Sequence, residues 1–449
     1  MTTVTMFPAI RTLFLLLATL LLAGPASLLA DEPTRPNIVM IVSDDHLWSD
    51  YSFLGNRDVR TPNIDRLAAE SLTFTRGYVP SSLCCPSLAS IVTGLYPHQH
   101  GITSNDPPNN LGVSKQEFRR SPAFREGREE MNRMLEAVPT LPRQLGELGY
   151  VSLQTGKWWQ GHFKRGGFTA GMTQGGRHGD DGLQIGRETM EPINDFIAAA
   201  KQKDEPFFVW YAPMMPHSPH NPPERLLQKY RDKAPSRHVA KYWAMVEWFD
   251  ETVGSLLAEL DKQGLRDDTI VVYVTDNGWI TNPRTGAYAP KSKQSQYDGG
   301  LRTPIIIRWP GHVEPHRSDA LASSLDLAPT LLAAAGGAPT KEMPGIDLLD
   351  EKARAARATL HGECFTPQSL DLADPAANLR YRWLISGHWK LIVPAPQNEP
   401  DGEVELYDLN VDPREESNLA AEHPEVVKSL QTELDAWWDG KSKARTSDG

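Results

Sequence analysis

The chain has 449 residues, of which 40% are hydrophobic and 23% charged, as in an ordinary globular protein long enough for a large core and a smaller second domain. Its formal net charge of −11 argues against a nucleic-acid partner, because a phosphate backbone is bound by basic surfaces. Its three cysteines are too few for a disulfide scaffold. One disulfide bond, from Cys84 or Cys85 to Cys364, remains possible.

Residues 1–30 have the pattern of a secretory signal peptide. Arg11 precedes a short apolar run, LFLLLATLLLA, which the small residues of GPASLLA follow. The run is short for a bilayer span, so we expect cleavage near Ala30 rather than the alternative, an uncleaved N-terminal anchor. The mature chain is then expected to be exported, either to the periplasm or to the medium, with no stable membrane insertion.

Strand-like and helix-like segments alternate through the first three quarters of the chain. Apolar, β-branched runs predict strands, at residues 37–43, 150–154, 206–212, 269–275 and 305–309. Helices are predicted between them, from residue 62 with Ile64, Leu67, Ala68 and Leu72 on one stripe, and over 140–148, 242–260 and 325–335. A shorter helix is expected to begin near Cys84 and stop at Gly94. This alternation predicts an α/β fold with a large, mixed but mostly parallel sheet flanked by helices.

Three segments depart from the alternation. Residues 104–135 are polar and charged and predict a surface insertion, and residues 163–188 are rich in glycine and predict a mobile loop. Beyond residue 362, short strand-like runs at 382–386, 390–393 and 405–407 precede a helical run at 425–438. We therefore predict a large α/β domain over 31–361 and a smaller α+β domain with an antiparallel sheet over 362–449.

Polar side chains follow four of the predicted strands. Asp44 and Asp45 end the first strand, and Asp276 and Asn277 end the strand at 269–275. The carboxyl ends of parallel strands meet at one edge of a sheet, where ligands bind. Oxygen ligands suit a hard cation such as calcium or magnesium, although each pair alone is equally typical of a turn or a helix cap.

Three basic side chains accompany these oxygens. Lys157 and His217 follow the strands at 150–154 and 206–212, and Lys293 lies in the segment PKSKQSQYDGG. Beside a metal they would form a pocket for an oxyanion and could supply a proton to a leaving group. Taken singly, each is also consistent with an ordinary surface or loop residue.

In the order and number of its motifs, the chain resembles the type I sulfatases of the alkaline-phosphatase-like superfamily. The resemblance covers residues 37 to about 420. The motifs that carry it are NIVMIVSDD, TPNIDRLAAESLTFTRGYV, CCPSLASIVTG, TGKWW, PHSPH, VTDNG, KQSQYDGGLRTPIIIRWPG, DLAPTLLAAAG and ELYDLNVDPREESNLA.

The resemblance implies a sulfuric ester hydrolase acting on a sulfated carbohydrate or an aryl sulfate. It implies that a maturation enzyme oxidises Cys84 to formylglycine (3-oxoalanine), whose hydrated form attacks sulfur. It also implies roles for the residues at the family's positions. Asp44, Asp45, Asp276, Asn277 and modified Cys84 match the ligands of one Ca²⁺ ion, Lys157 and Lys293 the sulfate-binding lysines, and His217 the partner of the leaving oxygen.

Two positions depart from the family's motifs. Leu88 stands where the family has an arginine that supports maturation and the nucleophile, and Trp159 stands where it has a histidine. His162 is a nearby candidate to replace that histidine. These departures keep two alternatives open, namely a related phosphoric or phosphonic ester hydrolase and a catalytically impaired, sulfatase-like binding protein.

Overall fold

The computed structural model of the protein describes residues 1–3 and 35–442. The signal peptide predicted over residues 1–30 lies almost wholly outside these described residues. None of the helices in the described part has both the length and the apolar character that a membrane crossing requires.

The centre of the molecule is an eight-stranded sheet with the order β4-β3-β5-β1-β6-β7-β2-β8. Its strands are β1 (Asn37–Ser43), β2 (Leu72–Tyr78), β3 (Val151–Gly156), β4 (Ala170–Gly171), β5 (Phe207–Ala212), β6 (Thr269–Thr275), β7 (Arg302–Arg308) and β8 (His316–Ser323). Strand β7 runs antiparallel to both of its neighbours, and the other recorded pairings are parallel. The predicted mixed, mostly parallel sheet is therefore confirmed.

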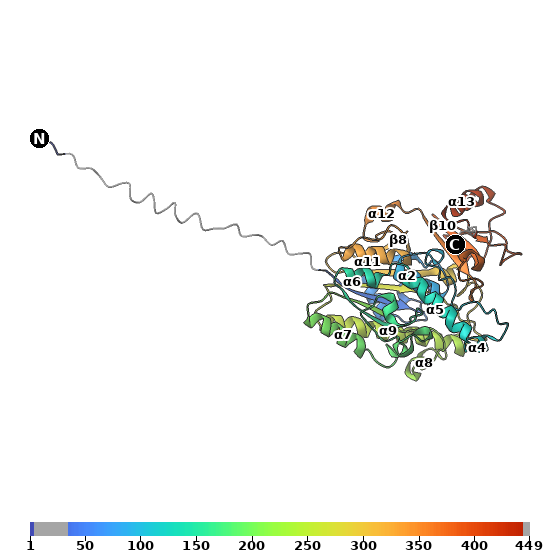
Figure 1. The fold of residues 1–449 in the computed structure, drawn as a ribbon, viewed down its shortest axis with the longest axis horizontal. Helices are drawn as coiled ribbons and strands as arrows, with labels where there is room; N and C mark the ends of the chain where they lie inside the picture. Colours follow the sequence, from blue (N-terminus) through green and yellow to red (C-terminus); the bar gives the residue numbers. More distant parts are fainter. Residues whose placement is uncertain (4–34, 443–449) are drawn as a thin grey trace. The chain divides into compact units, whose positions relative to one another are not determined.

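Helices cover both faces of this sheet (Figure 1). Successive side chains of a strand point to opposite faces, so Met40 and Val42 of β1 enter one core cluster while Val39 and Ile41 enter the other. The first cluster is completed by α2 (Cys84–Thr93), α5 (Pro122–Glu136), α6 (Leu141–Glu147) and α11 (Leu327–Ala334). The second is completed by α1 (Pro62–Ala69), α7 (Glu191–Gln202) and α9 (Arg237–Lys262).

Shorter helices lie in the connections. They are α3 (Pro97–His100), α4 (Lys115–Phe118), α8 (Glu224–Tyr230), α10 (Asp298–Leu301) and α12 (Glu351–Ala356), with 3₁₀ turns η1 (Ser52–Leu54), η2 (Phe163–Gly166), η3 (Arg177–Gln184), η4 (Ser324–Asp326) and η5 (Pro375–Asn378).

A second, four-stranded antiparallel sheet has the order β12-β11-β10-β9. It consists of β9 (Thr359–Phe365), β10 (Leu379–Ser386), β11 (Trp389–Pro394) and β12 (Glu405–Asp408), and α13 (Pro424–Trp437) packs on it through Leu430 and Leu434. The antiparallel sheet and closing helix predicted for the C-terminal part are confirmed. The domain boundaries at 361 and 362 stay predictions.

Local predictions were wrong at several places. Leu72 does not continue the stripe of α1, because that helix ends at Ala69 and Leu72 begins β2. The sequence analysis did not predict strands β2 and β8, because threonines, charged residues and histidine interrupt their apolar pattern. The predicted surface insertion at 104–135 also contributes to the core, since Met131 and Leu135 of α5 are buried.

Candidate active site

The carboxyl ends of three neighbouring strands are tied together by their own backbone. The Asp44 amide donates to the Met215 carbonyl beyond β5 at 2.9 Å, and the Asp276 amide donates to the Ser43 carbonyl of β1 at 2.9 Å. The His46 amide donates in turn to the Asn277 carbonyl at 3.1 Å. These bonds bring residues from distant parts of the chain to one edge of the sheet, as the strand ends predicted.

The four predicted oxygen ligands lie together at this edge, and each is at most 2% exposed. Oδ2 of Asp44, Oδ2 of Asp45 and Oδ1 of Asn277 are buried and have no hydrogen-bond partner among the described residues. Buried polar atoms normally have partners, so these three oxygens are suited to coordinate a ligand. An all-oxygen donor set with unsatisfied carboxylates fits a hard divalent cation such as calcium.

Candidate ligand atoms of Asp44, Asp45, Cys84 and His217 all lie within 4.8 Å of one another. The structure therefore brings the residue at the start of α2 to the same point as the carboxylates from β1. Cys84 is 1% exposed, and Gly94 closes its helix in a left-handed conformation with φ of 69°. The short helix predicted between these two residues is confirmed.

Two lysines neutralise part of the carboxylate charge. Lys157 Nζ lies 2.6 Å from Asp44 Oδ1 and 3.3 Å from Asp276 Oδ2, and Lys293 Nζ lies 2.6 Å from Asp45 Oδ1. Both side chains are buried, so the alternative that they are solvated surface lysines is wrong. Burial by itself lowers the pKa of Lys157, but the neighbouring carboxylates, Asp44 foremost, raise it well above its usual value.

His217 lies beside the same carboxylates. Its Nε2 is 3.5 Å from Asp45 Oδ2, and its Nδ1 donates to the carbonyl of Ser218. Burial lowers the pKa of His217, against the opposing effect of Asp44 and Asp45. The site therefore holds a partly buried imidazole with Nε2 directed toward the carboxylates.

The thiol of Cys84 has a raised pKa in its encoded form. Burial raises its pKa to about 12, although Lys157 and Lys293 partly oppose this shift. A thiol with so high a pKa supplies almost no thiolate near neutral pH. All three cysteines are free, so the disulfide to Cys364 that the sequence left open is not formed.

The two departures from the motifs have different surroundings. Leu88 is 2% exposed within the core on the α2 side of the sheet. Trp159 lies between two guanidinium groups, with the Cζ atoms of Arg128 and Arg177 5.5 and 4.4 Å from its ring centre. Arg128 therefore packs against Trp159. The prediction of a surface insertion at residues 104–135 had suggested instead that Arg128 lies on a solvated helix face.

The candidate replacement for the missing histidine is not in the cluster. His162 is committed to local structure, where its Nδ1 accepts from the Lys164 amide at the start of η2. His178, which the sequence analysis overlooked, lies instead against both Trp159 and His217. His178 lies in the glycine-rich segment GGRHGDDG. Because this segment was predicted to be a mobile loop, the sequence analysis did not consider His178 as a site residue.

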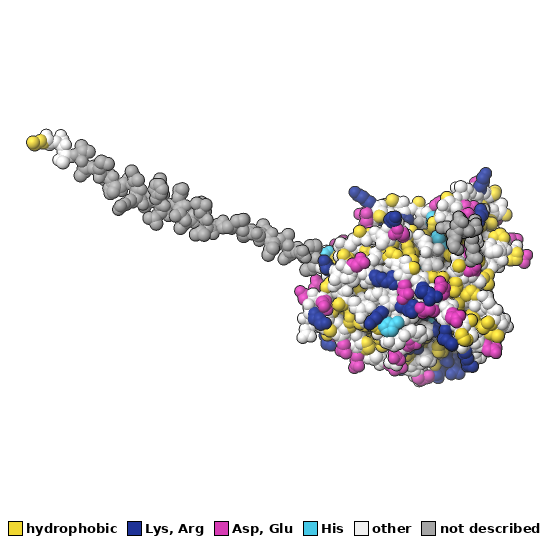
Figure 2. Space-filling view, in the orientation of Figure 1, with side chains coloured by type: hydrophobic (Ala, Val, Ile, Leu, Met, Phe, Trp, Pro, Cys, Tyr) yellow, Lys and Arg dark blue, Asp and Glu magenta, His cyan; other side chains and the backbone are white. Residues whose placement is uncertain are grey.

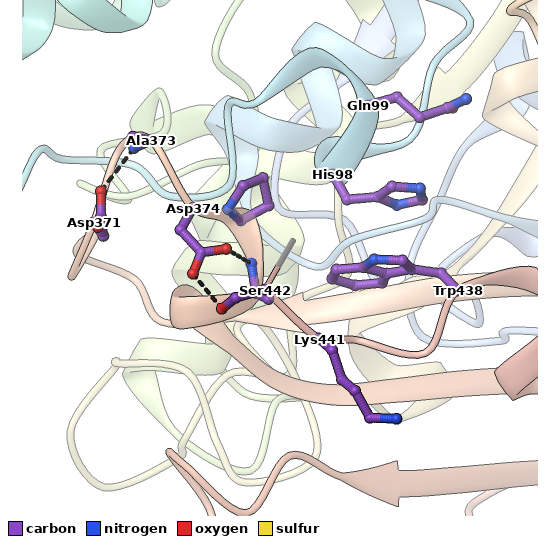
Figure 3. A pocket seen from close by; sticks show the side chains of 10 residues that line it. His98, Gln99, Asp371, Ala373, Asp374, Trp438, Lys441 and Ser442 are labelled. Carbon is purple, nitrogen blue, oxygen red and sulfur yellow. Dashed lines mark hydrogen bonds between the residues drawn. The ribbon is translucent and has the colours of Figure 1, made fainter. Parts of the chain in front are cut away.

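A cavity of about 880 Å³ lies elsewhere, and none of the predicted site residues lines it. In Figure 3 the imidazole of His98 lies flat against the indole of Trp438, with ring centres 4.5 Å apart. On the face shown in Figure 2, acidic and basic side chains are interspersed.

The sequence comparisons agree on one family. The sulfatase family model matches residues 36–338, and the model of the N-sulphoglucosamine sulphohydrolase C-terminal region matches residues 286–439. N-acetylgalactosamine-6-sulfatase of Rattus norvegicus is 30% identical over 386 residues, which cover 76% of this chain and 70% of the relative.

Solved structures share the fold. Ps i-CgsB in complex with k-i-k-neocarrahexaose has a TM-score of 0.72 at 23% identity, covering 91% of this chain and 94% of that one. The phosphonate monoester hydrolase of Agrobacterium radiobacter has a TM-score of 0.68 at 18% identity, covering 92% and 97%.

The mixed sheet and the small antiparallel sheet place the chain in the alkaline-phosphatase-like class of folds. Within that class the chain belongs to the sulfatase family, and it is an enzyme of the sulfuric ester hydrolase type.

Proposed function

We propose that the protein is an exported, calcium-dependent and formylglycine-dependent sulfatase that removes sulfate from a sulfated carbohydrate. The observation that carries this proposal is the buried cluster of carboxylate and amide oxygens beside Lys157, Lys293 and Cys84, and three of these oxygens have no hydrogen-bond partner in the described part of the chain. A pocket of this kind holds a cation and an anionic ester together.

Asp44, Asp45, Asp276 and Asn277 are the proposed calcium ligands, together with modified Cys84. Calcium would polarise the ester oxygens and lower the pKa of the nucleophile. The formylglycine made from Cys84 by a maturation enzyme would supply, as its hydrate, the hydroxyl nucleophile that an inert thiol does not.

The basic residues have separate proposed tasks. Lys157 and Lys293 bind sulfate oxygens, and their ion pairs with Asp44 and Asp45 hold both ammonium groups in place before substrate arrives. In its protonated form, His217 would donate the Nε2 proton to the leaving oxygen, since its Nδ1–H is committed to the Ser218 carbonyl.

The relatives support a proposal for the substrate class. N-acetylgalactosamine-6-sulfatase is named for a sulfated sugar, and the structure of Ps i-CgsB was solved with a neocarrahexaose. We therefore infer that a sulfated glycan is the substrate, with small aryl sulfates as surrogates. The proposed signal peptide delivers the enzyme to the compartment in which such glycans occur.

The test combines peptide mass with activity. The protein is produced beside a competent maturation system, and the peptide containing residue 84 is weighed. Formylglycine lowers its mass by about 18 Da relative to cysteine. The same preparation is assayed on 4-nitrophenyl sulfate, on sulfated hexosamines and on a phosphonate monoester. We expect the modified peptide and release of sulfate that EDTA abolishes.

The control variants separate the alternatives. Cys84→Ala and Asp276→Ala should abolish hydrolysis, and Asp276→Ala should also weaken calcium binding, whereas Asp267→Ala at an exposed carboxylate should do neither. Unmodified cysteine with no turnover favours the binding protein, and faster phosphonate hydrolysis favours the second alternative. Full activity of Asp276→Ala would refute the ligand assignment.

A further inference from the structure

The glycine-rich loop seats His178 directly on the segment that carries Lys157. The Trp158 amide donates to the His178 carbonyl at 3.2 Å. Gly179 packs so closely on the Gly156 carbonyl that a Cβ there would come within 2.3 Å of its oxygen. Two backbone contacts therefore set the position of His178 relative to the anion pocket.

The imidazole of His178 contacts the site itself. It stands edge-on to Trp159, with ring centres 4.4 Å apart and planes at 78°, and its centre lies 6.0 Å from that of His217. Burial lowers its pKa first, and the positive charges of Arg177 and Lys157 lower it further. A neutral ring is therefore held among the groups that face the proposed sulfate.

One hydrogen bond determines which ring nitrogen carries the proton. Arg177 Nη1 lies 2.7 Å from His178 Nε2, and a guanidinium only donates. Nε2 is then the acceptor, so the neutral ring carries its hydrogen on Nδ1. Arg177 is itself held by Asp106, with Nε 3.0 Å from Oδ1, and by the face of Trp159. His178 is therefore a donor at Nδ1, and it has no free lone pair to act as a base.

The backbone at this point is strained. His178 has φ of 76° and ψ of −15°, a left-handed conformation that non-glycine residues adopt at a cost. Such outliers gather at functional sites, where the surrounding structure maintains them. Asp45, at φ of 60°, and Gln294, next to Lys293, at φ of 65°, are further examples in this site.

We propose that His178 is a substrate-binding residue whose Nδ1–H donates a hydrogen bond to the sulfate group of the ester, a task that Arg177 and Trp159 prepare. The inference rests on the proposed function, because it takes the anion beside Lys157 and Lys293 to be that sulfate. A second donor belongs to the indole that His178 contacts. The Nε1 of Trp159 is a buried donor with no hydrogen-bond partner among the described residues.

The test compares three substitutions at this position. His178→Ala removes the donor, His178→Gly removes it while accepting the positive φ, and His178→Asn keeps an amide N–H near the place of Nδ1 and tolerates the left-handed conformation. Loss of a hydrogen bond to a charged group should lower kcat/KM for 4-nitrophenyl sulfate roughly 10- to 100-fold in the first two variants. His178→Asn should retain most of it, and His162→Ala, in the same loop, should match the wild type.

Binding of inorganic sulfate provides a readout independent of turnover. Its dissociation constant, measured by calorimetry on the calcium-loaded protein, should rise in His178→Ala and His178→Gly by a factor similar to the loss of kcat/KM, with partial rescue in His178→Asn. Unchanged sulfate binding in His178→Gly overturns the inference, as does an Asn variant as impaired as Gly at an equal Tm. If the wild type hydrolyses no sulfate ester, the proposed function fails, while the sulfate-binding comparison still decides the role of His178.

Discussion

Asp45, Asp50 and Asp276 are all buried aspartates, yet their surroundings shift their pKa values in opposite directions. Burial raises the pKa of Asp45, but Lys293 and other cations outweigh it and hold the value at about 2. Burial raises the pKa of Asp50 to about 7. Burial, followed by the nearby Asp44 charge, raises the pKa of Asp276 to about 8. Residue type alone therefore does not determine the charge state of a buried carboxyl; its partners do.

The raised pKa of Asp50 predicts how the free energy of unfolding depends on pH. Its pKa in the fold, about 7, lies above its ordinary value of 3.8, so between these values the folded state binds more protons than the unfolded state. The stabilisation is fully present below about pH 4 and is lost as the pH rises through 7. We expect Asp50→Asn, which cannot ionise, to lack this decline and to exceed the wild type at pH 7.5 by on the order of 4 kcal/mol, since each pKa unit corresponds to about 1.4 kcal/mol.

The measurement is urea unfolding at several pH values between 4.5 and 8. The exposed Asp267→Asn variant should follow the wild-type curve. Parallel pH curves for Asp50→Asn and the wild type would contradict the prediction.

At the scale of elements, α1 begins without a side-chain cap of its own. Its first amides are satisfied by a carboxylate of another helix, since Asn63 and Ile64 donate to Asp250 Oδ1 of α9 at 3.0 and 2.8 Å. The Asn63 side chain donates to Asp250 Oδ2 at 2.8 Å. A negative charge at a helix N-terminus is attracted to the positive end of the helix dipole. Asp250 therefore positions α1 against α9.

Asp250→Ala should therefore lower the free energy of unfolding by about 2–3 kcal/mol, because it leaves buried donors unpaired. The loss should appear as a lower urea midpoint with an unchanged slope. Asp261→Ala, at an exposed position of the same helix, is the matched control and should stay within about 0.5 kcal/mol of the wild type. Equal losses in the two variants would show that the contact to α1 contributes nothing particular.

At the scale of the whole molecule, a buried charged triad joins the two sheets. Lys390 of β11 lies 2.8 Å from Asp298 Oδ1 of α10 and 2.7 Å from Glu415 Oε1. All three side chains are at most 1% exposed, and the Asp298 amide donates to Glu415 Oε2 at 2.6 Å. Each of these buried charges depends on its partners, so the triad couples the antiparallel sheet to α10, which directly precedes β7 of the large sheet.

Lys390→Met should lower the free energy of unfolding by about 3–5 kcal/mol, since it leaves two carboxyl groups buried without their cation. The triple variant that adds Asp298→Asn and Glu415→Gln should recover much of this loss, because no charge then remains buried. Thermal and urea unfolding of the three proteins measure the effect. A triple variant less stable than Lys390→Met would argue that shape at this position, rather than charge, decides the coupling.

The strands that carry the site were predictable because their sequences are continuous apolar runs that end in polar residues. Asp44, Lys157, His217 and Asp276 each follow such a run, so their placement at one edge follows from the parallel topology. The polar strands β2 and β8 carry no such local signal; their pairing with each other, and that of β2 with β7, places them in the sheet.

The amino-acid sequence by itself determined the α/β class, the membership of the sulfatase family and the identity of the residues at the strand ends, because hydrophobic periodicity and motif order are written along the chain. Only the tertiary structure decided which side chains meet. It buried both lysines against carboxylates, left three oxygens without hydrogen-bond partners within residues 1–3 and 35–442, and placed His178 rather than His162 against His217. The physical reason is that contact, burial and protonation depend on distances between residues far apart in the chain, which no local pattern encodes.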